Sequence, residues 1–577
     1  MTDPNKNINA EVIAVFPNKV KLSVDDLSKF ISADEQLEKL KVGSYLEIAD
    51  DDNHKLIAII ESYAIVVDEK KASGRSYVID ANPLGIIEGN NFTRGGDALT
   101  IPPTKVLPAK QSDIKAIFCS GLKDKERFCF SKLAQNIKID TPVNGNRFFN
   151  KHFAIVGSTG SGKSHTVAKI LQNAINAKNS GYDGLNNSHI VLFDIHGEYK
   201  SAFPNANHVD STNINIPYWL FDSDELGDLF IESNEDNSHN QVSQFRFAVT
   251  GNKKKFNPNL PQDKIYFDSP LKFDIDEVIR YIKNINNELI NKKNNRCPTT
   301  KANEIIANRI PKYFESDLEF EKTSADFVNG PYSGDFERFI LRLETIRNNP
   351  RLKFLFDNRN EIELESILKQ FLGYTDERKA NVTVFDLSGI PFEVLSITVS
   401  LISRILFEYG YYYKRLLTGN AACETPLLLV YEEAHKYVPK SDLVKYRASK
   451  TAIERIAKEG RKYGITLGIV SQRPAEISET IFSQCNNFIA MRLTNPDDQN
   501  YVKRLLPDSL GNLTDTLPAL KTGEALLIGD SIVMPSIVKV DECKEYCPSS
   551  NDINYVEIWK EKWKDVVFNK IVEEWKK

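Results

Sequence analysis

Short apolar runs alternate with segments of helical periodicity over residues 147–540. The runs FAIV, HIVLFD, VTVFD, LLLVY and ITLGIV are almost continuous in aliphatic and aromatic residues. Such runs are typical of strands whose two faces are both covered by helices, and their alternation with helical segments favours a parallel sheet. We therefore predict an α/β core.

Two regions depart from this alternation. Residues 9–110 hold short runs such as EVIAVF, SYLEIAD and RSYVIDA between Gly, Pro, Asn and Asp residues, which predicts a small N-terminal β-barrel. Residues 209–375 hold longer runs such as FDIDEVIRYIKNINNELI and are rich in Asn and Lys. This pattern indicates a helical insertion between the second and third strands of the core.

The end of the chain carries an apolar stripe on a charged segment. Its members recur at steps of four and so share one face of a predicted helix: Trp559, Trp563, Val567, Ile571 and Trp575. Two interpretations are open. The stripe packs on its own domain, or it docks on a neighbouring subunit, since large exposed apolar stripes are rare on monomers.

Composition and charge narrow the possible partners and compartments. With 74 Lys and Arg against 79 Asp and Glu, the net charge of −5 mildly repels a polyanion, so any contact with nucleic acid has to be local. The seven cysteines are scattered, which fits reduced thiols, and the close pair Cys543 and Cys547 lacks further zinc ligands. We find no signal sequence and no apolar run of about 18 residues, and expect a soluble cytoplasmic protein without a membrane anchor.

A phosphate-binding motif follows the first core strand. Gly157, Gly162, Lys163 and Ser164 have the spacing G-x-x-x-x-G-K-S between the run FAIV and a segment of helical periodicity. In such a loop, backbone amides and a helix N-terminus surround a phosphate chain, the lysine reaches the β- and γ-phosphates, and the serine hydroxyl holds Mg²⁺. The predicted ATP-binding residues are Gly157, Ser158, Thr159, Gly160, Ser161, Gly162, Lys163, Ser164 and His165.

Two acidic residues follow a later strand, in the run PLLLVYEEAH. P-loop enzymes carry there a carboxylate for the Mg²⁺ site and then one that polarises the attacking water, which predicts Glu432 as a metal ligand with Ser164 and Glu433 as the catalytic base. The first of these is usually Asp, so Glu432 brings one extra methylene. Gln472 ends the next strand and is suited to sensing the γ-phosphate or the lytic water.

A basic helical segment, AIERIAKEGRKYG, precedes that last strand. Arg455, Lys458 and Lys462 share one face, and Arg461 lies just past Gly460, a predicted helix stop. An exposed basic face is the commoner explanation of such a run. The sharper one is an arginine that reaches the nucleotide of an adjacent subunit and stabilises the transition state.

In their order along the chain, GSTGSGKS, FDIHGEY, VFDLSG, LLLVYEEAH, IAKEGRKYGITLGIVSQRP and MRLTNPDDQNYV resemble the motifs of the HerA–FtsK superfamily of P-loop motors, and HerA most of all. VGSYLEI, NPLGIIEGNNFTRGG and LTIPPTKVLPA are similar to the β-barrel of HerA proteins. The resemblance implies a homo-hexameric ring with ATP and Mg²⁺ at subunit interfaces and double-stranded DNA in the central pore. It also implies an effector partner, either a nuclease or, in phage-defence pairs, a sirtuin-like NADase or another nuclease.

The resemblance assigns roles to single residues. Lys163 and Ser164 correspond to the Walker A pair, Glu432 and Glu433 to the Walker B pair, and Gln472 to the sensor. Arg455 or Arg461 corresponds to the arginine finger, and Lys151 to a further basic group at the interface.

Other polar residues have more than one interpretation. Asp194, His196 and Glu198 in FDIHGEY are expected beside the nucleotide and not as metal ligands, and His435 is expected to orient its neighbours. Lys253 to Lys255 and Lys292 to Arg296 are candidate DNA contacts, although solvated charge runs are the commoner explanation.

These observations define the expected architecture. The fold class is α/β, a RecA-like P-loop NTPase core with a helical insertion, preceded by a small N-terminal β-barrel. The expected parts are the barrel (1–110), the first part of the ATPase core (111–208), the helical insertion (209–375), the second part of the core (376–540) and a helical tail (541–577).

Three functions remain open at this stage. The first is an ATP-hydrolysing motor that translocates duplex DNA and works with a nuclease or NADase effector in DNA processing or phage defence. The second is an ATP-dependent ring scaffold that regulates an effector, with DNA as a trigger or not needed. The third, a motor acting on protein, is disfavoured because no membrane anchor is visible.

Overall fold

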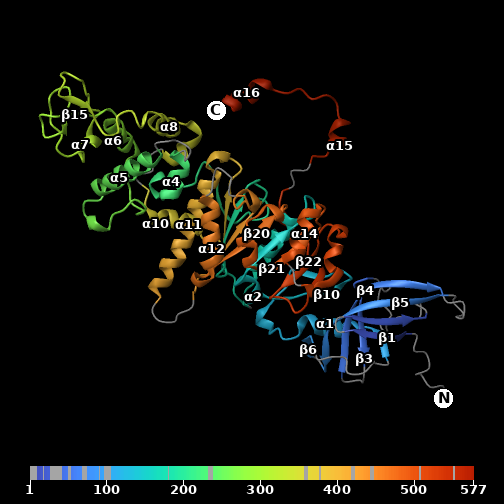
Figure 1. Cartoon of the computed structure of the whole chain (residues 1–577). Helices are drawn as coiled ribbons and strands as arrows, with labels where there is room; N and C mark the ends of the chain where they lie inside the picture. Colours follow the sequence, from blue (N-terminus) through green and yellow to red (C-terminus); the bar gives the residue numbers. More distant parts are fainter. Residues whose placement is uncertain are drawn as a thin grey trace, which may run out of the picture.

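The computed structural model places three bodies in a row, with the N-terminal strands at one end, the α/β core in the middle and the helical insertion at the other end (Figure 1). The described residues are 10–16, 19–25, 42–49, 54–67, 75–89, 91–95, 105–179, 181–231, 238–356, 362–375, 378–417, 423–441, 448–505, 508–549 and 553–576. Residues 99–104 of the motif LTIPPTKVLPA lie outside them.

The core is one sheet of 11 strands. Seven strands run parallel and four antiparallel strands extend one side. The predicted α/β core is confirmed. In spatial order the strands are β10 (Asn136–Asp140), β9 (Ser131–Leu133), β23 (Ser536–Val540), β22 (Glu524–Gly529), β21 (Cys485–Met491), β12 (His152–Val156), β20 (Ile465–Ser471), β19 (Leu427–Tyr431), β13 (His189–Asp194), β18 (Val382–Asp386) and β14 (Asn207–Val209).

Both faces of this sheet are buried. In β12, Phe153 and Ile155 belong to one apolar cluster while Ala154 and Val156 belong to another, because successive side chains of a strand point to opposite faces. This explains why the core strands read as continuous apolar runs. The helices of the core are α1 (Gln111–Cys119), α2 (Gly145–Phe149), α3 (Lys163–Asn176), α11 (Phe392–Leu416), α12 (Ala448–Glu459), α13 (Glu479–Gln484) and α14 (Pro496–Leu505).

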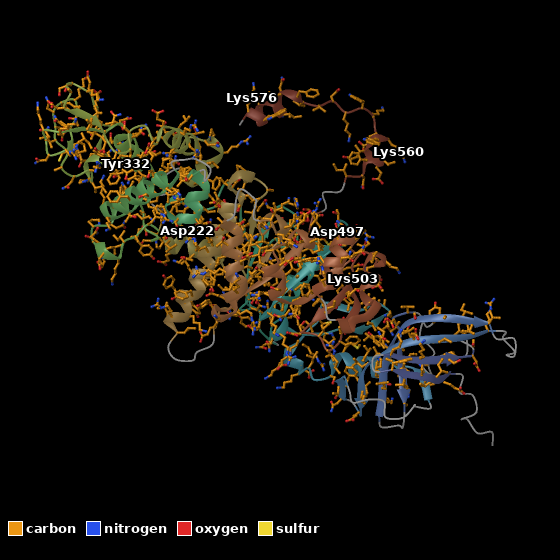
Figure 2. The ribbon with its side chains drawn as sticks, in the orientation of Figure 1. Asp222, Tyr332, Asp497, Lys503, Lys560 and Lys576 are labelled. Atoms are coloured by element: carbon orange, nitrogen blue, oxygen red, sulfur yellow. The ribbon has the colours of Figure 1, made fainter. Side chains whose placement is uncertain are left out.

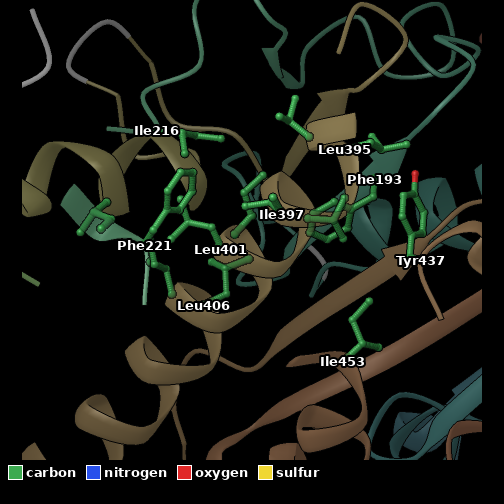
Figure 3. Packing of buried hydrophobic residues seen from close by; sticks show 14 of the residues in the cluster. Phe193, Ile216, Phe221, Leu395, Ile397, Leu401, Leu406, Tyr437 and Ile453 are labelled. Atoms are coloured by element: carbon green, nitrogen blue, oxygen red, sulfur yellow. The ribbon is translucent and has the colours of Figure 1, made fainter. Parts of the chain in front are cut away.

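Helix α11 is the long apolar helix of the core. Ile397, Leu401 and Leu406 lie in the larger cluster, near which Figure 3 also shows Phe193 and Tyr437. The segment Val394–Leu416 is long and apolar enough to cross a membrane, but 78% of its most apolar window is buried inside the protein. The prediction that the chain has no apolar run of about 18 residues is therefore wrong, and the burial shows that this segment packs as a core helix.

The N-terminal strands form a curled antiparallel sheet that stays open. Its order is β1-β2-β5-β4-β3-β7, with β6 paired to β5, and no ladder joins β1 to β7 among the described residues. A barrel requires pairing between the first and last strands, so the predicted closure is not confirmed. The strands are β1 (Ala10–Phe16), β2 (Lys19–Val24), β3 (Tyr45–Ala49), β4 (His54–Val67), β5 (Arg75–Glu88), β6 (Asn91–Arg94) and β7 (Lys105–Pro108).

The segment between β14 and β18 consists of helices joined by long connections and includes a small sheet of three strands that the sequence pattern did not predict. It is tied to the core by Glu225, which is buried and accepts a hydrogen bond from Arg404 Nη2 of α11 at 2.8 Å. Its elements are α4 (Ser223–Phe230), α5 (Ser238–Phe256), α6 (Ile275–Asn287), β15 (Leu289–Asn291), β16 (Cys297–Pro298), α7 (Lys312–Glu315), β17 (Phe327–Asn329), α8 (Glu337–Arg347), α9 (Lys353–Phe356) and α10 (Leu364–Phe371).

Residues 553–576 of the predicted tail extend away from the core, whereas residues 541–549 pack on it, and the Ser549 amide donates to the Glu198 carbonyl at 2.8 Å. The single predicted helix is wrong, because the structure has two short helices, α15 (Tyr555–Trp559) and α16 (Phe568–Lys576). Trp563, in the connection between them, is 95% exposed. Figure 2 shows Lys560 and Lys576 of the tail apart from the rest of the chain. The stripe therefore does not pack on its own domain, and docking on a neighbouring subunit stays a prediction.

Candidate nucleotide-binding site

The P-loop joins β12 to α3 and is fixed to the strands on both sides of β12. The amide of Gly157 donates to the Ser471 carbonyl of β20 at 3.2 Å, and the amide of Ser158 donates to the Arg492 carbonyl after β21 at 2.8 Å. Gly162, with a φ of 101°, is the residue before the first turn of α3. This position requires a left-handed backbone, which glycine adopts readily and a residue with a side chain does not.

This loop ends at the N-terminus of a helix of 14 residues. The free amides and the dipole of such a terminus favour an anion. Lys163 is buried, and its Nζ lies 3.4 Å from the Ser158 carbonyl inside the loop. The structure thus places an ammonium group within the concave side of the loop, where a phosphate chain would meet it.

Glu432, directly after β19, is a buried carboxyl group near the P-loop. Its Oε2 accepts a hydrogen bond from the Tyr199 hydroxyl at 2.8 Å. Burial raises the pKa of Glu432 to about 8, and the charge of Glu433 adds to this, while the Tyr199 hydrogen bond and Lys163 act in the opposite direction. A divalent cation nearby would favour the ionised form.

The pKa of Glu433 is shifted in the opposite direction. Burial alone would raise its pKa, but His435 and the positive charge of Lys163 outweigh burial and lower it. His435 Nδ1 lies 3.2 Å from Glu433 Oε2. Glu433 also has a left-handed backbone with a φ of 49°, which is strained for a residue with a side chain and is common at functional sites. Two adjacent carboxyl groups with pKa values pushed apart are typical of acid–base assignments.

Gln472 connects the neighbouring strand to the loop. It follows β20, and its Oε1 accepts a hydrogen bond from Thr159 Oγ1 at 2.7 Å. The structure brings the predicted sensor to the tip of the P-loop.

The turn after β13 contributes groups that the motif alone did not assign. Asp194 is buried and accepts hydrogen bonds from the amides of His196 at 3.2 Å and Tyr199 at 2.9 Å, so it stabilises the turn. Ser164 Oγ donates to Glu198 Oε2 at 2.9 Å. Among the described residues, no group of three or more His, Cys, Asp or Glu side chains could hold a metal ion by itself.

The contacts of Tyr199 and Arg492 were missed by sequence reasoning. Tyr199 meets Glu432 across 233 positions of the chain, and Arg492 borders the loop from β21. The only signals were their places in the motifs FDIHGEY and MRLTNPDDQNYV. Neither motif states which side chain faces the nucleotide.

The candidate arginine fingers lie away from their own P-loop. Arg461 precedes β20, whereas the P-loop follows the opposite end of the parallel strand β12. The seven residues of β20 separate the two edges by about 20 Å. The Arg455 guanidinium lies 4.6 Å from the ring centroid of Phe407, and Lys151 forms an ion pair with Asp530. Arg455 and Arg461 are exposed.

One proposed DNA contact is wrong. Lys253 is buried, and its Nζ donates to the carbonyls of Phe267 at 2.5 Å and Ser269 at 2.6 Å. Burial lowers the pKa of Lys253 to about 7. Lys255 forms an ion pair with Glu277 at 2.7 Å, and Lys293 forms one with Asp326 at 2.5 Å. Lys253 therefore serves the packing of the insertion.

Comparison with known proteins gives consistent matches. Residues 128–406 match the family model described as the central domain of helicase HerA. The chain is 28% identical over 546 residues to a probable helicase of Methanocaldococcus jannaschii, covering 93% of this chain and 94% of the relative. It is 25% identical over 498 residues to the DNA double-strand break repair helicase HerA of Sulfolobus acidocaldarius, covering 82% and 81%. VirB4 of Thermoanaerobacter pseudethanolicus matches 74% of this chain and 98% of its own, with a TM-score of 0.46 and 13% identity.

The motifs and these matches define a P-loop ATPase of the HerA–FtsK superfamily. Within this superfamily, residues 128–406 match the central domain of helicase HerA, and the chain is similar to HerA helicases over most of its length, as its motifs predicted.

Proposed function

We propose that the chain hydrolyses ATP at the carboxyl edge of its RecA-like core and uses the energy to move along double-stranded DNA. The observation that carries the proposal is the meeting of three groups from separate strands at one place. The P-loop, the pair Glu432 and Glu433, and Gln472 all lie at the ends of neighbouring parallel strands. This is where ligands bind in open α/β sheets.

The chemistry follows from the charges of the site. The loop amides and Lys163 bind the phosphate chain. Glu433, ionised at neutral pH, accepts the proton of the attacking water, and Gln472 positions that water or the γ-phosphate. Ser164 and Glu432 would hold Mg²⁺, because hydroxyl and carboxylate oxygens suit a hard cation, whose charge would favour the ionised form of Glu432 against the effect of burial. Mg²⁺ there would neutralise charge on the β- and γ-phosphates.

The proposed assembly is a homo-hexamer with DNA in its central pore and an effector, a nuclease or a NADase, docked on the ring. The relatives are named as DNA double-strand break repair helicases, which supports DNA as the substrate. The exposed positions of Arg455 and Arg461 support a role at a subunit interface. We also propose that the parts of the chain meet at residues 110, 208, 375 and 540.

Displacement of a triplex-forming oligonucleotide from duplex DNA tests this function. The native chain with ATP and Mg²⁺ should release the third strand, and duplex DNA should stimulate ATP hydrolysis. Glu433→Gln should bind ATP and DNA but release nothing. If the native chain hydrolyses ATP at one rate with and without duplex DNA and never displaces the third strand, DNA translocation is refuted, and a ring scaffold that regulates an effector becomes the better account.

A further inference from the structure

An arginine borders the P-loop on the side opposite the glutamate pair. Arg492 directly follows β21, which pairs with β12 on one side while β20 pairs with it on the other. The Arg492 carbonyl accepts from the Ser158 amide at 2.8 Å, and the Thr494 amide donates to Ser158 Oγ at 3.0 Å. Two backbone groups of the segment 492–494 therefore hold it against the loop.

The guanidinium of Arg492 lies at the tip of the loop. A Cβ atom built on Gly160 would stand 4.0 Å from Arg492 Nη2. The Nε atom is buried without a hydrogen-bond partner, and no ion pair joins Arg492 to a carboxylate in the part of the chain that the structure describes. Buried donors are nearly always paired, and a guanidinium matches the geometry of phosphate oxygens.

We propose that Arg492 is a nucleotide-binding residue that contacts the phosphate chain of the nucleotide held by its own subunit. This inference rests on the proposed ATPase function. Glu433 and Gln472, which face the terminal phosphate in that proposal, follow β19 and β20 on the other side of β12. Arg492 therefore contacts the part of the phosphate chain that ADP and ATP share, and it sets affinity rather than the rate of hydrolysis.

Titration of the full-length protein with fluorescent mant-ADP and mant-ATP tests the assignment. Arg492→Met keeps the aliphatic stem and removes the charge, so the Kd for both nucleotides should rise about 10- to 100-fold, as expected for a hydrogen bond to a charged group. At ATP concentrations below saturation, the ATPase rate of Arg492→Met should fall in proportion to its loss of affinity. Arg338→Met, a matched change at an exposed position of α8, should leave both Kd values unchanged.

Two results would overturn the assignment. One is an unchanged Kd for both nucleotides in Arg492→Met, and the other is a loss of kcat without a loss of affinity. If Arg492→Met does not fold, Arg492→Lys replaces it, and an unchanged Kd for that variant would also count against Arg492, because lysine lacks the planar fork. Lys163→Ala separates the two proposals: if it binds nucleotide normally, the proposed ATP site itself has failed, whatever Arg492 does.

Discussion

The two edges of the parallel sheet differ in what they hold. At the carboxyl edge, the P-loop, Glu432, Glu433 and Gln472 converge. Hydrogen bonds join Gln472 to Thr159 and Glu432 to Tyr199, and His435 Nδ1 lies 3.2 Å from Glu433 Oε2. At the amino edge, Arg461 lies on the surface without an anionic partner in the part of the chain that the structure describes.

In the proposed ring, this difference explains how one chain would bind a nucleotide and still depend on a second chain for hydrolysis. The carboxyl edge has the groups for binding phosphate and activating water. In that proposal, Arg461 at the amino edge of the neighbouring chain would supply the positive charge that neutralises the transition state. A ring of identical chains places unlike edges against each other at every interface.

The largest expected effect is the loss of nucleotide binding at the carboxyl edge. Lys163→Ala deletes the buried ammonium inside the loop, so binding of mant-ATP should become undetectable at concentrations that saturate the native chain. Lys169→Ala, on the same helix but outside the loop, should bind normally. Normal binding by Lys163→Ala would mean that the loop does not hold the phosphate chain.

The next largest effect is a loss of ATP hydrolysis at the same edge while ATP binding is retained. Glu433→Gln keeps the size of the side chain but cannot accept a proton, so kcat should fall about 10²- to 10⁴-fold with Kd for ATP retained. Glu337→Gln, an exposed position on α8, is the matched control. A steady-state phosphate-release assay measures both variants, and parental turnover in Glu433→Gln would remove it from the mechanism.

A smaller change tests the connection between β13 and β19. Tyr199→Phe removes the hydroxyl that stabilises ionised Glu432, so the pKa of Glu432 should rise further above about 8. Because the ionised form is needed for Mg²⁺, the variant should require a higher pH and about tenfold more Mg²⁺ for half-maximal ATPase activity. Tyr546→Phe, whose ring is half exposed, should match the native pH profile. An unshifted profile for Tyr199→Phe would contradict this role.

The smallest effect concerns the amino edge and is a change in stability. His152 accepts the Leu467 amide at 3.0 Å, so its other nitrogen donates to the Ala457 carbonyl at 2.9 Å, and the ring is neutral. Burial lowers the pKa of His152 to about 4. The unfolded chain therefore binds a proton more readily, and the free energy of unfolding should fall by up to about 3 kcal/mol as the pH drops from about 6.5 to 4.

Urea unfolding at several pH values measures this contribution. His152→Asn should be less stable than the native chain at pH 7, because it loses buried hydrogen bonds, but its stability should change less between pH 7 and 4. The exposed His239→Asn should keep the native pH dependence. Equal pH dependence in the native chain and His152→Asn would show that another group controls it.

Local patterns predicted the features that local physics fixes. The core strands were found because burial on both faces makes them apolar throughout, and the P-loop because glycine and lysine spacing follows from phosphate geometry. Contacts between distant segments were missed. Nothing near Tyr199 in the sequence states that its hydroxyl meets Glu432, because the order of the strands in the sheet brings them together.

Charge and apolar patterns also failed to predict features that depend on tertiary packing. Lys253 looked like a member of an exposed run, yet aromatic rings and two carbonyl oxygens enclose it. The N-terminal strands alternate as in a barrel, but closure depends on whether the edge strands β1 and β7 pair, which no single strand reveals. The step of four in the tail continued through Trp563, where the structure has no helix.

The central claim is that the carboxyl edge of one subunit is completed by the amino edge of the next. A mixture of Lys163→Ala, which keeps Arg461 but cannot bind ATP, with Arg461→Ala, which binds ATP but lacks the arginine, measures this directly. Each variant alone should be inactive, and the mixture should recover part of the native ATPase rate as the subunits exchange. An Arg461→Ala variant with full activity on its own, or an assembled mixture that recovers none, would contradict the account.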